Sequence, residues 1–82
     1  DSQTITPALI AAVARRETDE DIDIFVDRHG LDGLAAAVEY AADYVEGTVN
    51  HRITARELDL SPLEAEIILQ ALEPVVTEYR TT

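Results

Sequence analysis

The chain of 82 residues contains no cysteine, methionine, tryptophan or lysine. Without cysteine it has no disulfide, thiolate nucleophile or cysteine-based metal site, which suits a reducing cytoplasm. Its longest apolar run, residues 8–14, is too short to span a bilayer, and no basic segment precedes it. We therefore expect a cytoplasmic protein with no membrane partner. Because methionine is absent, we also expect a processed chain or a fragment of a longer one.

Positive charge is also scarce. Six arginines stand against 17 aspartates and glutamates, which gives a formal net charge of -11. Such a surplus repels itself at low ionic strength, whereas in molar salt the Debye length falls to about 3 Å and the repulsion is screened. The composition resembles that of haloarchaeal proteins, and this resemblance implies a cytoplasm of high salt. The alternative is an ordinary acidic domain whose charge serves solubility.

The apolar content predicts a packed core despite this charge. Hydrophobic residues make up 46% of the chain, which is too many for a disordered acidic tail. A chain of this length forms one small domain that buries about 60% of its unfolded surface. We therefore expect a single helical domain over residues 1–82.

Apolar residues recur at spacings of three and four, and no stretch alternates as a strand does. The pattern predicts an all-α fold, a compact bundle of four or five short helices. Thr6 and Thr18 are the expected N-caps of the first two helices, which end near Arg16 and at Gly30. A third helix is expected over residues 32–46, stopped by Gly47.

Two capping boxes follow, Thr54 with Glu57 and Ser61 with Glu64. They predict a short helix from Thr54, a tight corner and a longer helix after Ser61, which Pro74 would stop or kink. The C-terminal half is therefore expected to have a helix-turn-helix-like form.

Residues 53–72 resemble the helix-turn-helix of winged-helix-type transcription regulators. The match lies in Thr54, Glu57, Leu58, Leu60, Ser61, Ile68 and Leu72. The resemblance implies that the helix after Ser61 enters the major groove of DNA. On this alternative the residues that contact nucleic acid are Arg52, Arg56, Gln70 and Arg80.

The polar stripe of that last helix is acidic. At 100° per residue it comprises Glu66, Gln70, Glu73 and Thr77. Phosphate contacts require cations or polar donors, so this stripe disfavours nucleic acid as the partner. A simple corner between two helices is the other interpretation, because capping motifs occur in many helical proteins.

Apolar side chains cover most of the remaining circumference of this helix. A helix of that kind is either central to its own bundle or covered by a second chain. Our hypothesis is the second: a dimer in which the partner covers Leu69, Val75 and Val76. Arg52 and Arg56 would then pair with acidic groups of a protein partner.

Several possible sites are set aside. Four aspartates lie close together, Asp19, Asp21, Asp23 and Asp27, but a calcium loop needs glycine where Ile24 stands and glutamate where Gly30 stands. His29 is expected to favour the C-terminus of its helix, and His51 to lie on an exposed connection.

The segment Leu31-Asp32-Gly33-Leu34 resembles the Asp-Ser-Leu motif of acyl carrier proteins, yet Gly33 has no hydroxyl to carry phosphopantetheine. We expect no catalytic residue, no metal and no cofactor. The expected function is a non-catalytic protein-interaction or regulatory module of a halophilic organism, self-associating and not an enzyme. The alternative is a DNA-binding transcriptional regulator.

Overall fold

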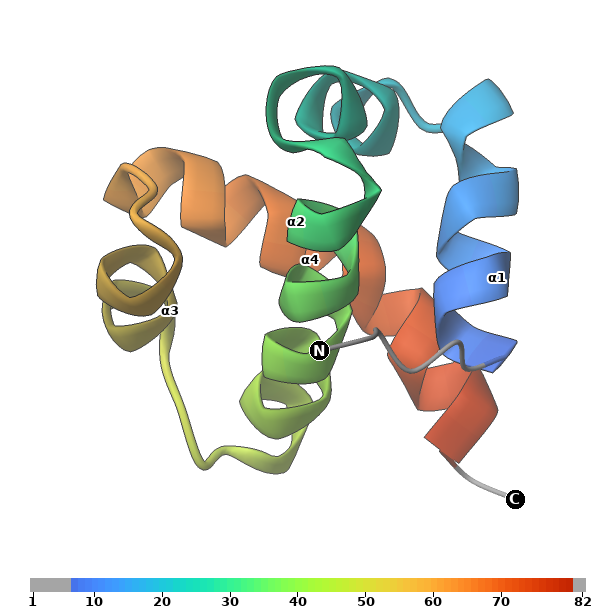
Figure 1. Cartoon of the computed structure of the whole chain (residues 1–82). Helices are drawn as coiled ribbons and strands as arrows, with labels where there is room; N and C mark the ends of the chain where they lie inside the picture. The colour runs from blue at the N-terminus through green and yellow to red at the C-terminus, as the bar shows by residue number, and fades with distance from the viewer. Residues whose placement is uncertain (1–6, 81–82) are drawn as a thin grey trace.

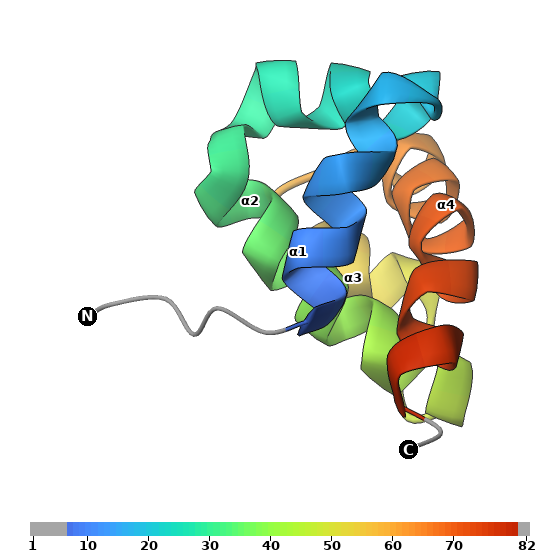
Figure 2. The ribbon, with the colours of Figure 1, turned by 90° about the vertical axis from the view of Figure 1, so that its right-hand side faces the viewer.

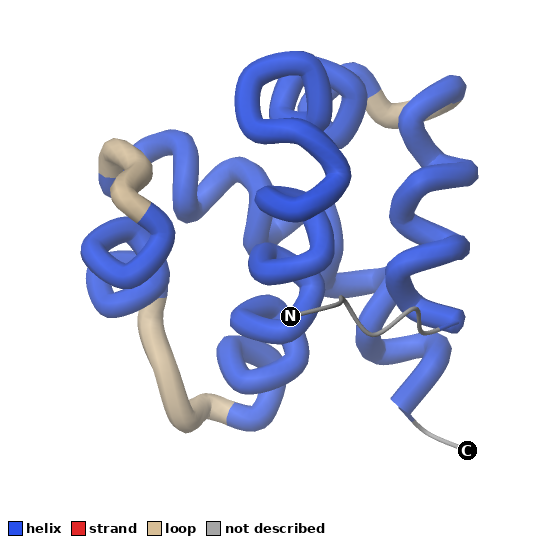
Figure 3. Tube along the Cα trace, viewed as in Figure 1, coloured by secondary structure: helices blue, strands red, loops and turns tan. Residues whose placement is uncertain are grey.

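In a computed structural model, residues 7–80 form four α-helices and one 3-10 turn (Figure 1). The structure describes residues 7–80, with the backbone alone of Arg80. The elements are α1 (Pro7–Ala14), η1 (Arg15–Glu17), α2 (Glu20–Glu46), α3 (His51–Leu58) and α4 (Pro62–Arg80). No strand occurs over residues 7–80 (Figure 3), so the all-α prediction is confirmed.

The centre of the molecule is the contact between α2 and α4. α1 packs against both of them on one side, α3 packs against both on the other, and α1 does not contact α3 (Figure 1). α1, α2 and α4 thus contribute buried side chains to a common core, and Leu58 of α3 packs against it. The compact bundle expected from the sequence is present.

α2 is kinked at Gly30. Its φ of 75° and ψ of 179° lie outside the helical region and in a part of conformational space that favours glycine. The first segment of α2 runs across the molecule, and the second turns sharply away from it (Figure 2). The two segments correspond to the helices expected on either side of Gly30, and Gly47, with a φ of 85°, ends the second as expected.

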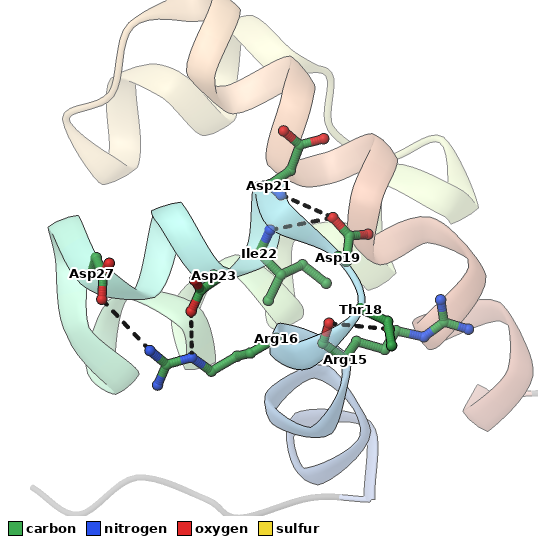
Figure 4. Close-up of polar contacts among 8 residues, drawn as sticks. All are labelled: Arg15, Arg16, Thr18, Asp19, Asp21, Ile22, Asp23 and Asp27. Carbon is green, nitrogen blue, oxygen red and sulfur yellow. Dashed lines mark hydrogen bonds and ion pairs between the residues drawn. The ribbon is translucent and has the colours of Figure 1, made fainter.

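The N-cap of α2 is Asp19, and the assignment of Thr18 was wrong. The Asp19 carboxylate accepts hydrogen bonds from the backbone N–H groups of Asp21 at 3.0 Å and Ile22 at 3.4 Å (Figure 4). Thr18 instead ends the 3-10 turn, where its backbone N–H donates to the Arg15 carbonyl. Asp19 has the extended backbone that a capping residue needs.

The N-cap of α3 is Asn50, and the prediction of a cap at Thr54 was also wrong. The Asn50 side-chain oxygen accepts from the backbone N–H of Ile53 at 2.9 Å. Thr54 is fully buried inside the helix, and its hydroxyl donates to the Asn50 carbonyl at 3.1 Å. α3 therefore begins three residues earlier than expected, at His51.

The start of α4 is as predicted, because Ser61 Oγ accepts from the backbone N–H of Glu64 at 3.1 Å and Pro62 is the first helical residue. Pro74 does not stop the helix, which continues to Arg80. The expected N-cap of α1, Thr6, lies outside the described residues.

The core draws on α1, α2 and α4. Its buried members are Leu9, Ala12, Ile22, Phe25, Val26, Leu34, Ala37, Val38, Ala41, Ile68, Leu69, Leu72, Val75 and Val76. Leu69, Val75 and Val76 are thus covered by their own chain, so the expectation that a partner covers them is corrected. All three belong to the buried cluster that α4 shares with α1 and α2.

Candidate functional site

A hollow of about 260 Å³ lies between the first segment of α2 and the start of α4. Its lining residues are Asp21, Ile24, Phe25, Arg28, Ser61, Leu63, Glu64, Ile67 and Ile68. We call it the α2/α4 groove. The two helices come together here because Phe25 and Ile68 are buried in the shared core beneath it.

The walls of the groove are exposed apolar side chains. Leu63 is 67% exposed, Ile24 43% and Ile67 39%. Leu63 and Ile67 lie one turn apart on α4 and therefore on the same face. Three large exposed apolar residues around one hollow form a patch of the kind that marks an interaction site.

Glu64 ties the two walls together. Its Oε2 lies 2.9 Å from Nε2 of His29 and 3.4 Å from Nη1 of Arg28, both at the end of the first segment of α2. The hydrogen bond from His29 is the largest cause and lowers the pKa of Glu64. Burial is the next largest and opposes it, and the contact with Arg28 adds a smaller lowering effect. The His29 ring also packs on Phe25, with centroids 4.6 Å apart.

The lining of the groove carries charges of both signs. Its charged residues are Asp21, Arg28 and Glu64, which sum to a formal charge of -1. Arg28 is 63% exposed at its side chain and remains open to a further partner. The groove is therefore an apolar surface with charges of both signs at its edge.

The aspartates before the groove have structural partners within the chain. Arg16 donates from Nε to Asp23 at 3.0 Å, and its Nη2 lies 3.6 Å from Asp27 (Figure 4). Asp19 serves as the helix cap described above. In the described part of the chain, no group of three or more His, Cys, Asp and Glu residues could hold a metal ion.

Arg52 and Arg56, predicted to contact a partner, lie one turn apart on α3, and both are exposed. Neither forms an ion pair with the residues that the structure describes. Neither belongs to the lining of the α2/α4 groove. The structure therefore gives these arginines a surface separate from the groove.

The residues of the nucleic-acid alternative are also spread out. α3 and α4 are joined by residues 59–61, with Asp59 in the left-handed conformation at a φ of 58°, and this is a helix-turn-helix-like arrangement. Gln70 is exposed and donates to Glu66 at 3.4 Å. The side chain of Arg80 lies outside the described residues. No arginine occurs in residues 57–79, so the exposed face of α4 presents leucine, isoleucine and carboxylates.

The groove was not predicted from the sequence. The exposed position of Ile24 was the one available signal, because it falls off the apolar face formed by Ile22, Phe25 and Val26. At about 260 Å³ the hollow is smaller than the usual 300–1,000 Å³ of small-molecule pockets. It suits one anchoring side chain better than a cofactor. Across residues 7–80, no helix is both long and apolar enough to cross a membrane.

Comparison with known proteins gives one result. A family model described as a family of unknown function (DUF7437) matches residues 16–81, which leaves α1 outside the match and includes the whole groove. No curated protein and no solved structure matches the chain. Because the matched region covers most of the sequence, this chain belongs to the DUF7437 family.

Proposed function

We propose that this protein is a non-catalytic protein-interaction module of a halophilic organism, that it works in the cytoplasm, and that it binds its partner in the α2/α4 groove. The observation that carries the proposal is the exposure of Leu63, Ile24 and Ile67 around one hollow. Burying an exposed Leu or Ile side chain contributes about 1.5–3 kcal/mol when burial is complete. Three such residues supply an anchor for a partner.

High salt strengthens this argument. Salts that are excluded from the protein surface increase the effective cost of exposed apolar area. A surface adapted to them, with its 17 acidic residues, is expected to keep large apolar side chains covered. The cluster at the groove departs from that expectation, and a bound protein would cover it.

Photo-crosslinking in a halophilic host tests the proposal. A photoreactive phenylalanine analogue is placed at Leu63, and in a matched control at Thr77, which is exposed on the same helix but outside the groove. We expect protein adducts from position 63 and few from position 77. Equal labelling from both positions, or none from position 63, would contradict the proposal.

DNA binding is the second candidate function, and the observation that favours it is the α3–α4 arrangement with two exposed arginines, Arg52 and Arg56, on α3. These arginines would contact phosphates while α4 entered the major groove. Fluorescence anisotropy with duplex DNA in concentrated potassium chloride tests it. Specific binding that is lost in Arg56→Glu would establish this function, whereas no binding would remove it.

A further inference from the structure

We infer that the partner in the α2/α4 groove is a second copy of this chain, related to the first by a two-fold axis. This inference rests on the proposed function and names its partner. The groove has three properties that such an interface requires: it has both a projecting side chain and a hollow, it contains a positive charge, and its charges match under two-fold symmetry.

The first property is the presence of a knob and a hole on one surface. In a two-fold interface the same patch of each copy contacts the other, so one patch must supply both the projecting and the receiving side chains. Leu63 projects from the edge of the groove with two thirds of its surface exposed. The hollow beside it, lined by Ile24 and Ile67, receives Leu63 of the second copy.

The second property is the presence of a positive charge. Two copies of this chain each carry -11, and most of their surfaces repel. At the groove Arg28 lies beside the two carboxylates of the lining, Asp21 and Glu64, and offers a carboxylate of the second copy a cation to meet.

The third property is the order of charges along the first segment of α2. When two such segments pack antiparallel with their centre between Ile24 and Phe25, Asp21 of one copy lies opposite Arg28 of the other, because both are equally far from that centre. This contact occurs twice and joins residues of opposite charge.

The size of the groove sets the expected strength. A stable interface buries about 800 Å² on each partner, which is a large share of the 5175 Å² accessible surface of this chain. The hollow itself takes one anchoring side chain from each copy. We therefore expect a reversible dimer with a dissociation constant in the micromolar range, of the order of 1–100 µM.

A charge-swap experiment tests the pairing. Sedimentation velocity is measured for the wild type, Asp21→Arg and Arg28→Asp at about 0.15 M salt, where exposed charges still interact over about 8 Å. Each single variant places like charges opposite one another in its own dimer, and we expect its dissociation constant to rise by about tenfold or more. An equimolar mixture of the two variants pairs the introduced arginine of one chain with the introduced aspartate of the other across the interface. We expect the association of this mixture to return to near the wild-type level.

Circular dichroism of each variant shows whether it is folded. The mixture contains the same two chains as the single-variant samples, so misfolding of a variant could not explain a return of association in the mixture. A wild type that stays monomeric at high concentration, or a mixture that associates no better than its components, would overturn the inference. The crosslinking experiment separates this failure from that of the proposed function. If position 63 forms adducts only with other proteins and none with a second copy of this chain, the proposed function stands and the inference of a dimer is wrong.

Discussion

Replacing Leu69 by alanine is expected to lower the free energy of unfolding by about 2–5 kcal/mol, because the side chain is fully buried in the core formed by α1, α2 and α4. The matched control is Leu63→Ala, the same substitution six residues earlier in the same helix. Leu63 is 67% exposed, so it has about a third of a fully buried leucine to lose. Its expected cost is roughly 0.5–1 kcal/mol.

Urea unfolding followed by circular dichroism in molar potassium chloride measures both values. The stability of a domain of this size is of the order of 5–15 kcal/mol, so the Leu69 variant loses a large share of it. The loss is expected to be the same at low and at high protein concentration, because the chain itself covers Leu69. A small loss, or one that appears only at concentrations where the wild type dimerises, would refute the placement of Leu69 in the core and restore it to an interface.

Three further predictions concern local features. Glu64→Gln is expected to lower the free energy of unfolding at neutral pH and to leave it unchanged in acid. The hydrogen bond from His29 lowers the pKa of Glu64, so the stability that the Glu64 carboxylate contributes is present above the ordinary carboxyl pKa and is lost as the pH falls through the lowered pKa. Urea titrations from pH 7 to pH 3 measure this difference. Gly30→Ala is expected to cost about 1–3 kcal/mol in the same assay, since alanine is strained at the φ of 75° and ψ of 179° found there. Asn50→Ala is expected to cost about 1 kcal/mol through loss of the cap of α3, and no change would contradict that assignment.

The helical fold and its main breaks were predictable from the sequence because they depend on local chemistry. Gly30 and Gly47 are required by positive φ values, and Ser61 with Pro62 forms a standard helix start. The wrong caps share one cause, which is that more than one residue near each helix start can act as a cap. The choice of Asp19 over Thr18 depends on where the preceding 3-10 turn ends.

The groove was not predictable in the same way. Periodicity showed that α4 is apolar on most sides, but not which neighbour covers which side. The bundle covers Leu69, whereas Leu63 and Ile67 remain exposed because the kinked first segment of α2 closes only partly over the start of α4. That outcome depends on tertiary packing around Gly30 and on the contact of His29 with Glu64.

Methyl NMR over a range of protein concentrations tests the central claim most directly, because it reports on each isoleucine and leucine side chain in the intact protein. If the α2/α4 groove is the binding surface, the methyl signals of Ile24, Leu63 and Ile67 shift with concentration while those of the buried Leu69 stay unchanged. Shifts that arise elsewhere, with the three groove residues unaffected, would contradict the account.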